Sequence, residues 1–208
     1  LVQFNIRGND LVNTVKMVKD TIDSKKLIPS GYFYRLGGEY EKYISARNRL
    51  LIVLPITLCL ILIILYFAFG DLRSALLIFL NVPIAISGGI LALFLRDLNF
   101  SISAGIGFIA LFGIAVLNGL VLVTFIRSLE GQGLNHVEAV RQGSLSRLRP
   151  VLTTALLASI GFLPMALSSS PGAEVQRPLA SVVIGGLITA SCLTLFVLPV
   201  VYLHLGKK

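Results

Sequence analysis

Long apolar stretches separated by short polar segments dominate the chain from residue 50 onward. There are five of them, at residues 50–69, 74–95, 102–126, 151–167 and 179–203. Each is close to or above the roughly 17–25 residues that an α-helix needs to cross a bilayer. The pattern predicts a mainly α protein, a polytopic membrane bundle of five transmembrane helices.

The third stretch, 102–126, is predicted to be an inner helix of the bundle. Small residues recur at short helical spacings between Gly105 and Gly113, which gives a face that another backbone can approach closely. Asn118 lies deep in the same stretch. A carboxamide in hydrocarbon is costly unless it is paired, so we expect Asn118 to point toward protein or water rather than lipid.

Residues 1–49 form the other part of the chain, ahead of a transmembrane domain at 50–208. Residues 1–7 alternate like a strand, the next segment has apolar positions at a helical period, and residues 32–36 have the pattern of a second strand. The pattern predicts a small β-α-β piece, which is too small to bury a core alone. We interpret it as the end of an α+β domain, followed by a polar helical lead-in to the membrane.

Residues 127–150 lie between the third and fourth stretches and scatter apolar residues among charged ones. This mixture is typical of an amphipathic helix on a membrane surface. Basic residues concentrate on the cytoplasmic side of membrane proteins. One side of the bundle would carry Arg73, Arg127, Arg141, Arg147, Arg149, Lys207 and Lys208. The short loops opposite carry Arg96 and Arg177, so we expect 127–150 and the C-terminus to be cytoplasmic, although the basic residues of 42–49 argue the other way.

Composition supports a membrane protein rather than a nucleic-acid binder. Of 208 residues, 55% are hydrophobic and 13% are charged, which is unusual for a soluble domain. The net charge of +8 is explained by basic residues that set topology and meet anionic lipid, so we expect no nucleic-acid partner. Cys59 and Cys192 lie in apolar stretches and are interpreted as small buried residues rather than a disulfide or a metal pair. The chain begins mid-pattern without Met, which we interpret as part of something longer.

The apolar stretches lack the groups on which proton coupling depends. A proton-coupled machine needs buried Asp, Glu, His or Lys, and no stretch has one at mid-depth. The polar candidates that remain are Asn118, Thr124, Thr153, Thr154 and Ser159. Threonines in helices mostly bond back to their own helix, whereas for Asn118 we favour a hydrogen bond between helices or beside a proton relay. Neither a catalytic residue, a metal ligand set nor a nucleotide loop is predicted, and therefore no cofactor.

The turn between the fourth and fifth stretches mixes charge and amide groups, at Glu174, Gln176 and Arg177. Glu174 and Arg177 are three residues apart and can pair as a simple interfacial cap. The alternative is a gate or coupling contact to an outer domain. His136 and His204 have no acidic partner in the pattern, and we interpret them as a solvated loop residue and an interfacial anchor.

Five segments of the chain match a known family in that family's order. They are GGEYEKYISARNRLLIVLP at 37–55, GFIALFGIAVLNG at 107–119, RLRPVLTTALLASIGFLPMALS at 147–168, GAEVQRPLASVVIGGL at 172–187 and LTLFVLPVVY at 193–202. They resemble the C-terminal end of resistance-nodulation-division efflux pumps, in particular the heavy-metal cation, CzcA-like branch.

The resemblance implies a fold, an activity and an assembly. The membrane helices would close a larger membrane domain, and residues 1–38 would end a periplasmic porter subdomain. The activity would be that of a secondary active transporter, a proton antiporter and not an enzyme. The resemblance implies a homotrimer in the inner membrane of a Gram-negative bacterium, with a periplasmic adaptor and an outer-membrane channel as partners. It also supports a periplasmic N-terminal block.

Departures from the family's pattern narrow the implied substrate. Drug-exporting relatives place a lysine before the asparagine that matches Asn118, where this chain has Leu117. Copper- and silver-exporting relatives carry a glutamate at that position, a lysine where this chain has Val151, and methionine ladders; here Met17 and Met165 are the two methionines. The resemblance therefore implies a divalent cation such as Zn, Co, Cd or Ni rather than Cu(I). Its ligands and the proton-carrying carboxylates would lie outside this sequence.

Two other interpretations stay open at this stage. One is an export-accessory or assembly membrane protein, similar to protein-translocation relatives of these pumps, which moves a polypeptide or docks a partner. The other is the product of a truncated or decayed pump gene. A large porter domain and paired membrane carboxylates in the rest of the protein would favour ion export.

Overall fold

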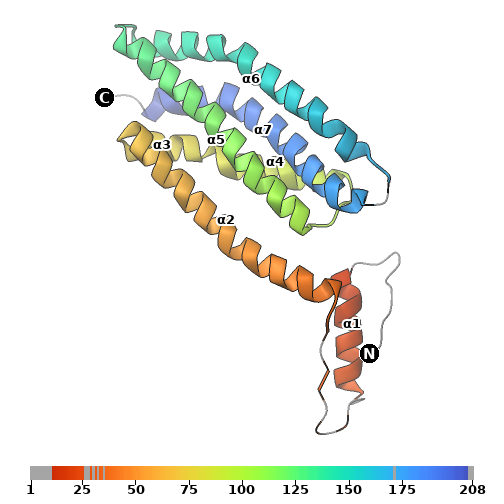
Figure 1. Cartoon of the computed structure of the whole chain (residues 1–208). Helices are drawn as coiled ribbons and strands as arrows, with labels where there is room; N and C mark the ends of the chain where they lie inside the picture. The colour runs from red at the N-terminus through yellow and green to blue at the C-terminus, as the bar shows by residue number, and fades with distance from the viewer. Residues whose placement is uncertain are drawn as a thin grey trace. The chain divides into compact units, whose positions relative to one another are not determined.

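The computed structural model describes residues 11–25, 29, 31, 33–34, 36–170 and 172–205. In these residues the chain forms helices, and from α2 onward short segments connect one helix to the next (Figure 1). They are α1 (Leu11–Ser24), α2 (Glu39–Phe69), α3 (Leu72–Phe79), α4 (Asn81–Leu95), α5 (Ile102–Gly131), α6 (His136–Leu167) and α7 (Ala173–Leu205). The chain divides into two compact units, Leu1–Leu51 and Ile52–Lys208, and each is described by itself.

The β-α-β piece predicted for the N-terminal unit is wrong, because the described residues contain helix α1 and no strand. In the predicted second strand, Phe33, Tyr34 and Leu36 have no regular secondary structure, and Phe33 is 93% exposed. A strand is stable only when a neighbouring strand takes up its backbone hydrogen bonds and a core covers one face. The described part of this unit offers no neighbouring strand. The first predicted strand, residues 1–7, lies outside the described residues.

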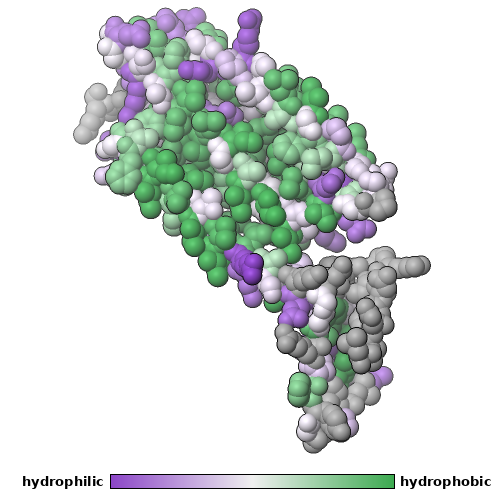
Figure 2. Space-filling view, in the orientation of Figure 1, coloured by the Kyte–Doolittle hydropathy of each residue, from purple (hydrophilic) through white to green (hydrophobic). Residues whose placement is uncertain are grey.

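The prediction of five membrane-spanning helices is confirmed by length and composition. The spans are Tyr43–Phe69, Leu72–Leu95, Ile102–Gly131, His136–Leu167 and Ala173–His204. Leucine, isoleucine and phenylalanine side chains are exposed along much of the bundle, and Figure 2 shows hydrophobic residues over much of its visible face. An apolar surface of this extent is expected in contact with lipid or other membrane helices and not with water.

The second span is built from two helices, α3 and α4, which are separated by Leu80. Asp71 begins α3 as its N-cap, because its side chain accepts hydrogen bonds from the backbone amides of Arg73 and Ser74. Pro83 has no backbone N–H to donate to the carbonyl of Phe79, four residues earlier, and its ring crowds that carbonyl. The break in this span therefore lies where the sequence places proline.

The third span, α5, continues to Gly131, and α6 begins at His136 after a turn that includes Gly133 with φ +92°. Residues 127–150 are thus shared between the end of α5 and the first half of α6. Helix α6 runs through Pro150 into the fourth apolar stretch. The sequence pattern predicts a surface segment followed by a separate membrane segment, whereas in the structure both belong to helix α6.

Helices α4, α5 and α7 meet at the centre of the bundle, where glycines allow close approach. A Cβ on Gly185 of α7 would lie 2.8 Å from the carbonyl oxygen of Gly88 on α4. A Cβ on Gly107 of α5 would lie 3.0 Å from the carbonyl oxygen of Leu179 on α7. Small residues at helix contacts are the usual means by which membrane helices pack. Gly113, in contrast, has nothing within 4 Å of its added Cβ, so the small residues of α5 do not share one packed face.

Candidate functional site

Asn118 is half-buried on α5, and its Nδ2 atom is buried without a hydrogen-bond partner in the described structure. The three threonines predicted with it are all exposed, and each donates to a carbonyl of its own helix. Thr124 bonds to Leu120 (2.8 Å), Thr153 to Arg149 (2.8 Å) and Thr154 to Val151 (2.9 Å). No hydrogen bond among described residues joins these threonines to Asn118. The structure therefore does not gather the predicted polar residues into one cluster.

Three residues that are buried and have polar atoms without a partner in the described residues were not among the sequence candidates. Asn81, the first residue of α4, is 0% exposed, and neither its Oδ1 nor its Nδ2 has a partner in the described structure. Ser191 and Thr194 of α7 are likewise buried, with hydroxyl groups that find no partner in the described residues. The sequence carried a signal for Asn81, an amide in an apolar stretch two residues before Pro83. Ser191 and Thr194 carried none, because serine and threonine are common in membrane helices.

At the turn between α6 and α7, two arginines hold the end of α6. The Arg177 guanidinium donates through Nε to the carbonyl of Ser168. Arg96, at the end of α4, donates to the carbonyl of Ala166 (2.7 Å) and to the hydroxyl of Ser181 (2.7 Å). Because the last carbonyls of a helix lack partners within it, cations placed there satisfy hydrogen bonds and the helix dipole together.

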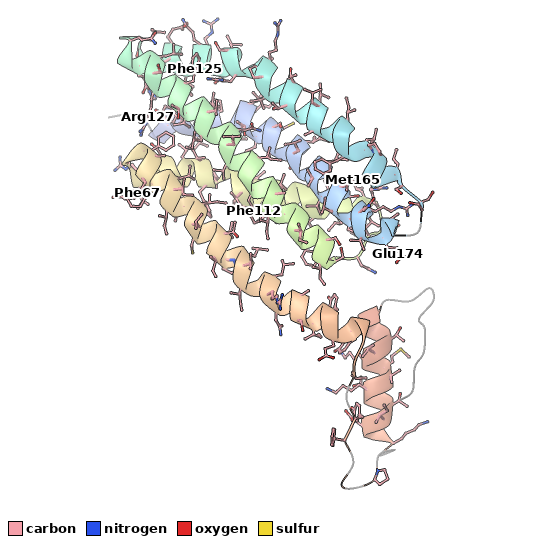
Figure 3. The ribbon with its side chains drawn as sticks, in the orientation of Figure 1. Phe67, Phe112, Phe125, Arg127, Met165 and Glu174 are labelled. Carbon is pink, nitrogen blue, oxygen red and sulfur yellow. The ribbon has the colours of Figure 1, made fainter. Side chains whose placement is uncertain are left out.

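The other two residues predicted at this turn lie outside that arrangement. Glu174 and Gln176 are exposed at the start of α7, and Figure 3 shows Glu174 beside the end of α6. The ion pairs of the described residues do not include Glu174 with Arg177. Arg177 is therefore a structural link between two helices, and Glu174 and Gln176 are surface residues in this chain.

At the opposite end of the bundle, Arg127 of α5 ties together three elements (Figure 3). It donates to the hydroxyl of Ser74 (2.6 Å) and the carbonyl of Phe69 (3.3 Å), and lies 3.6 Å from Asp71 Oδ2. Its guanidinium carbon lies 4.9 Å from the centre of the Phe69 ring. The pKa of Asp71 is lowered, mainly by the backbone N–H of Arg73, then by the Ser74 hydroxyl and further by Arg127. This group fixes the junction of α2 and α3 against α5.

Replacing Arg127 by lysine keeps the charge but removes the planar guanidinium that reaches three acceptors at once. We expect the thermal denaturation midpoint of the purified protein to fall. The free energy of unfolding should decrease by about 2 kcal/mol, because hydrogen bonds from a charged group are lost. The matched control is Arg141→Lys, because Arg141 is exposed and has a single 3.8 Å ion pair with Glu138. Equal midpoints for the two variants would contradict the structural role of Arg127.

The interpretation of His136 as a solvated residue without an acidic partner is wrong. Its Nδ1 lies 2.6 Å from Oε1 of Glu130, across the turn from α5 to α6. Tyr202 of α7 stacks on the His136 ring, with 5.6 Å between ring centres, and donates to Oε2 of Glu130 (3.4 Å). The pair was missed because it is formed by a turn, and the spacing of six residues corresponds to no helical or strand period.

No three His, Cys, Asp or Glu side chains of the described residues come together as a metal site. Cys59 and Cys192, predicted to be buried, are both exposed and unpaired. The chemistry available inside the bundle is therefore hydrogen bonding by neutral amides and hydroxyls. Charged groups act at its two ends, where they join helices.

Comparison with known proteins gives the context of this bundle. Residues 1–206 match the family model described as the AcrB/AcrD/AcrF family. The chain belongs to this family. The resemblance to heavy-metal resistance-nodulation-division pumps is thereby confirmed.

Among its relatives, the cobalt-zinc-cadmium resistance protein CzcA of Cupriavidus metallidurans is 50% identical over 208 residues, which are 100% of this chain and 20% of that protein. The nickel-cobalt-cadmium resistance protein NccA of Alcaligenes xylosoxydans xylosoxydans is 48% identical over 200 residues, 96% of this chain and 19% of that protein. The crystal structure of a heavy metal efflux pump is similar with a TM-score of 0.79 at 40% identity, and the match covers 97% of this chain and 20% of that one. This family member thus spans about a fifth of the length of its relatives.

Proposed function

We propose that this chain is the C-terminal membrane portion of a transporter that exports divalent heavy-metal cations. The observation that carries the proposal is the 50% identity with a cobalt-zinc-cadmium resistance protein along the whole chain. It is supported by five helices long and apolar enough to span a membrane. Because the apolar stretches contain no residue that titrates at mid-depth, the proton carriers and metal ligands belong to the rest of the protein. Metal export would be driven by protons moving in the opposite direction.

The placement of the chain is part of the same proposal. The transporter would be a homotrimer in the inner membrane of a Gram-negative bacterium, joined to a periplasmic adaptor and an outer-membrane channel. The N-terminal unit would be periplasmic and the C-terminus cytoplasmic, as the basic residues of the loops favour. Glu174 and Gln176 are exposed at a turn that would then face the periplasm, where they would contact the outer domain of the same protein.

The proposal is tested with the full-length protein. Deleting its gene should lower tolerance to at least one of Zn²⁺, Co²⁺, Cd²⁺ and Ni²⁺ severalfold, measured as the minimal inhibitory concentration, and restoring the gene should reverse the loss. Vesicles containing the purified protein should alkalinise their lumen when that metal is added outside, because antiport exchanges entering metal for leaving protons, as read by a pH-sensitive dye. Unchanged tolerance to all four ions together with no proton exchange would contradict the proposal.

Asn118 is proposed to form a hydrogen bond to the part of the transporter outside this chain. Its amide nitrogen is covered and has no partner in the described residues, but the side chain as a whole is half-buried, so another helix can reach its exposed part. Leu117 beside it is 58% exposed, which leaves this region of α5 accessible to a further helix.

Replacing Asn118 by leucine should lower the rate of metal transport with little loss of protein, because an apolar side chain of similar size cannot make that hydrogen bond. The measurement is metal uptake into inverted vesicles at equal protein content. Thr124→Val is the matched control, since Thr124 lies on the same helix and its hydroxyl bonds to Leu120. Transport by Asn118→Leu equal to that of the control would remove Asn118 from the mechanism.

A further inference from the structure

We propose that α4, α5 and α7 enclose a site for bound water, built from Asn81, Ser191 and Thr194. The starting observation is that Asn81 is 0% exposed and that both polar atoms of its amide lack a partner in the described residues. Leaving such a group unpaired in an apolar interior costs about 1–3 kcal/mol for each donor or acceptor. Buried polar groups are therefore nearly always paired with protein or with ordered water.

The burial of Asn81 decides where its partner must come from. Asn118 is half-buried, so a helix outside this chain can reach it. Asn81 is covered completely by the helices of this chain, so no further helix can contact it without displacing them. The partner must be small enough to lie inside the existing bundle.

The neighbouring helices bring further unpaired polar groups to the same region. The position where a Cβ of Gly119 would lie is 2.3 Å from Asn81 Nδ2 and 3.4 Å from Leu198 Cδ1, so Asn81 reaches the Leu198 region of α7. Thr194 and Ser191 precede Leu198 by four and seven residues and share its face of the helix. Thr194 is 0% exposed and Ser191 is buried, and neither hydroxyl has a partner in the part of the chain that is described.

These two hydroxyls differ from others in the membrane spans. The hydroxyls of Thr57, Ser87, Thr124, Thr153 and Thr189 all donate to carbonyls of their own helices. Ser191 and Thr194 could satisfy themselves in the same way, but in the structure they do not. Their hydroxyls are available to a molecule held between the helices.

Asn81 lies directly beside the break between α3 and α4. Pro83 cannot donate to the carbonyl of Phe79, and Leu80 separates α3 from α4 at this point. Ordered water is one of the means by which membrane helices satisfy carbonyls that proline leaves free. The groups without a partner in the described residues thus include the N–H donor and the carbonyl acceptor of the Asn81 amide, and two hydroxyls that both donate and accept.

This mixture of donors and acceptors identifies the ligand as water rather than a metal cation. A cation is bound by oxygen atoms and cannot satisfy the amide N–H of Asn81. A water molecule accepts from the amide and donates to a carbonyl or hydroxyl, and buried waters typically make about three such bonds. The inference concerns this chain alone and does not depend on the proposed transport activity.

The direct test is a cryo-electron microscopy map of the full-length protein in lipid nanodiscs, at a resolution that shows ordered water. We expect a water peak within hydrogen-bonding distance of the Asn81 amide and of the Thr194 or Ser191 hydroxyl. A direct bond from Asn81 to one of these residues with no water would overturn the proposal. Density for an ion, or a partner from the rest of the protein, would overturn it equally.

A second measurement compares variants by hydroxyl-radical labelling, in which bound water marks nearby side chains. The double variant Asn81→Leu/Thr194→Val should reduce oxidation of the peptides that contain Ile78 and Leu198 severalfold. Thr189→Val is the matched control, because Thr189 is on the same helix and its hydroxyl bonds to Gly185 and Gly186. Equal oxidation of these peptides in wild type, control and double variant would overturn the proposal. If the double variant does not fold, the cryo-electron microscopy map of the unmodified protein decides the question.

Discussion

Replacing Gly185 by alanine should destabilise the membrane bundle more than any other single-methyl change considered for this chain. The added Cβ would lie 2.3 Å from the Ala92 Cβ and 2.8 Å from the Gly88 carbonyl oxygen, both on α4. Neither atom is the end of a flexible side chain, so the two helices must separate to make room. Overpacking of this kind costs about 1–3 kcal/mol, and we expect a value near the upper end, read as a lower thermal denaturation midpoint and a lower yield of monodisperse protein.

The matched control is Gly161→Ala on α6, where an added Cβ meets nothing within 4 Å. The two variants share the same gain of one methyl group and the same rise in helix propensity. A second variant, Gly185→Ala with Ala92→Gly, removes one of the two clashes and should recover part of the lost stability. If Gly185→Ala had the same thermal denaturation midpoint as the control, α4 and α7 would not pack as closely as the structure places them.

The membrane helices could be predicted because a single property decides them. A helix satisfies its own backbone hydrogen bonds, so an apolar stretch long enough to span hydrocarbon specifies its secondary structure without help from elsewhere in the chain. The strands predicted for the N-terminal unit were wrong, because a strand depends on partners that its own sequence does not contain. Phe33 shows the limit: it has the side chain and the pattern of a strand residue, and it is exposed and irregular.

The polar residues show a similar limit. Asn118 could be identified because an amide in an apolar stretch is conspicuous. The residues that lie near it in space could not be identified from the sequence. The grouping of Asn81, Ser191 and Thr194 depends on which faces of α4, α5 and α7 meet, and the sequence of each helix alone does not specify this. His136 and Glu130 meet through a turn with a positive-φ glycine, Gly133, whose geometry no periodicity encodes.

Replacing Arg96 by glutamine should release the end of α6 from α4 and α7. Arg96 donates to the Ala166 carbonyl of α6 and to the Ser181 hydroxyl of α7, both at 2.7 Å, and so links α4 to both helices. Glutamine is shorter and uncharged, so it loses both bonds and the favourable interaction with the helix C-terminus. Hydrogen bonds to a charged group contribute about 1.5–3 kcal/mol to stability. We expect the free energy of unfolding to fall by about 2 kcal/mol.

The effect should be local, which makes it separable from general destabilisation. Hydrogen–deuterium exchange should become faster in the last turn of α6 and the first turns of α7, and should stay unchanged near Arg127 at the other end of the bundle. Arg73→Gln is the control, because the Arg73 side chain is exposed at the start of α3. Arg177 also binds this turn, through the Ser168 carbonyl, so a partial loosening in Arg96→Gln should become complete when Arg177→Gln is added. Exchange that rises equally at both ends, or not at all, would show that the two arginines do not act as the link between α6 and its neighbours.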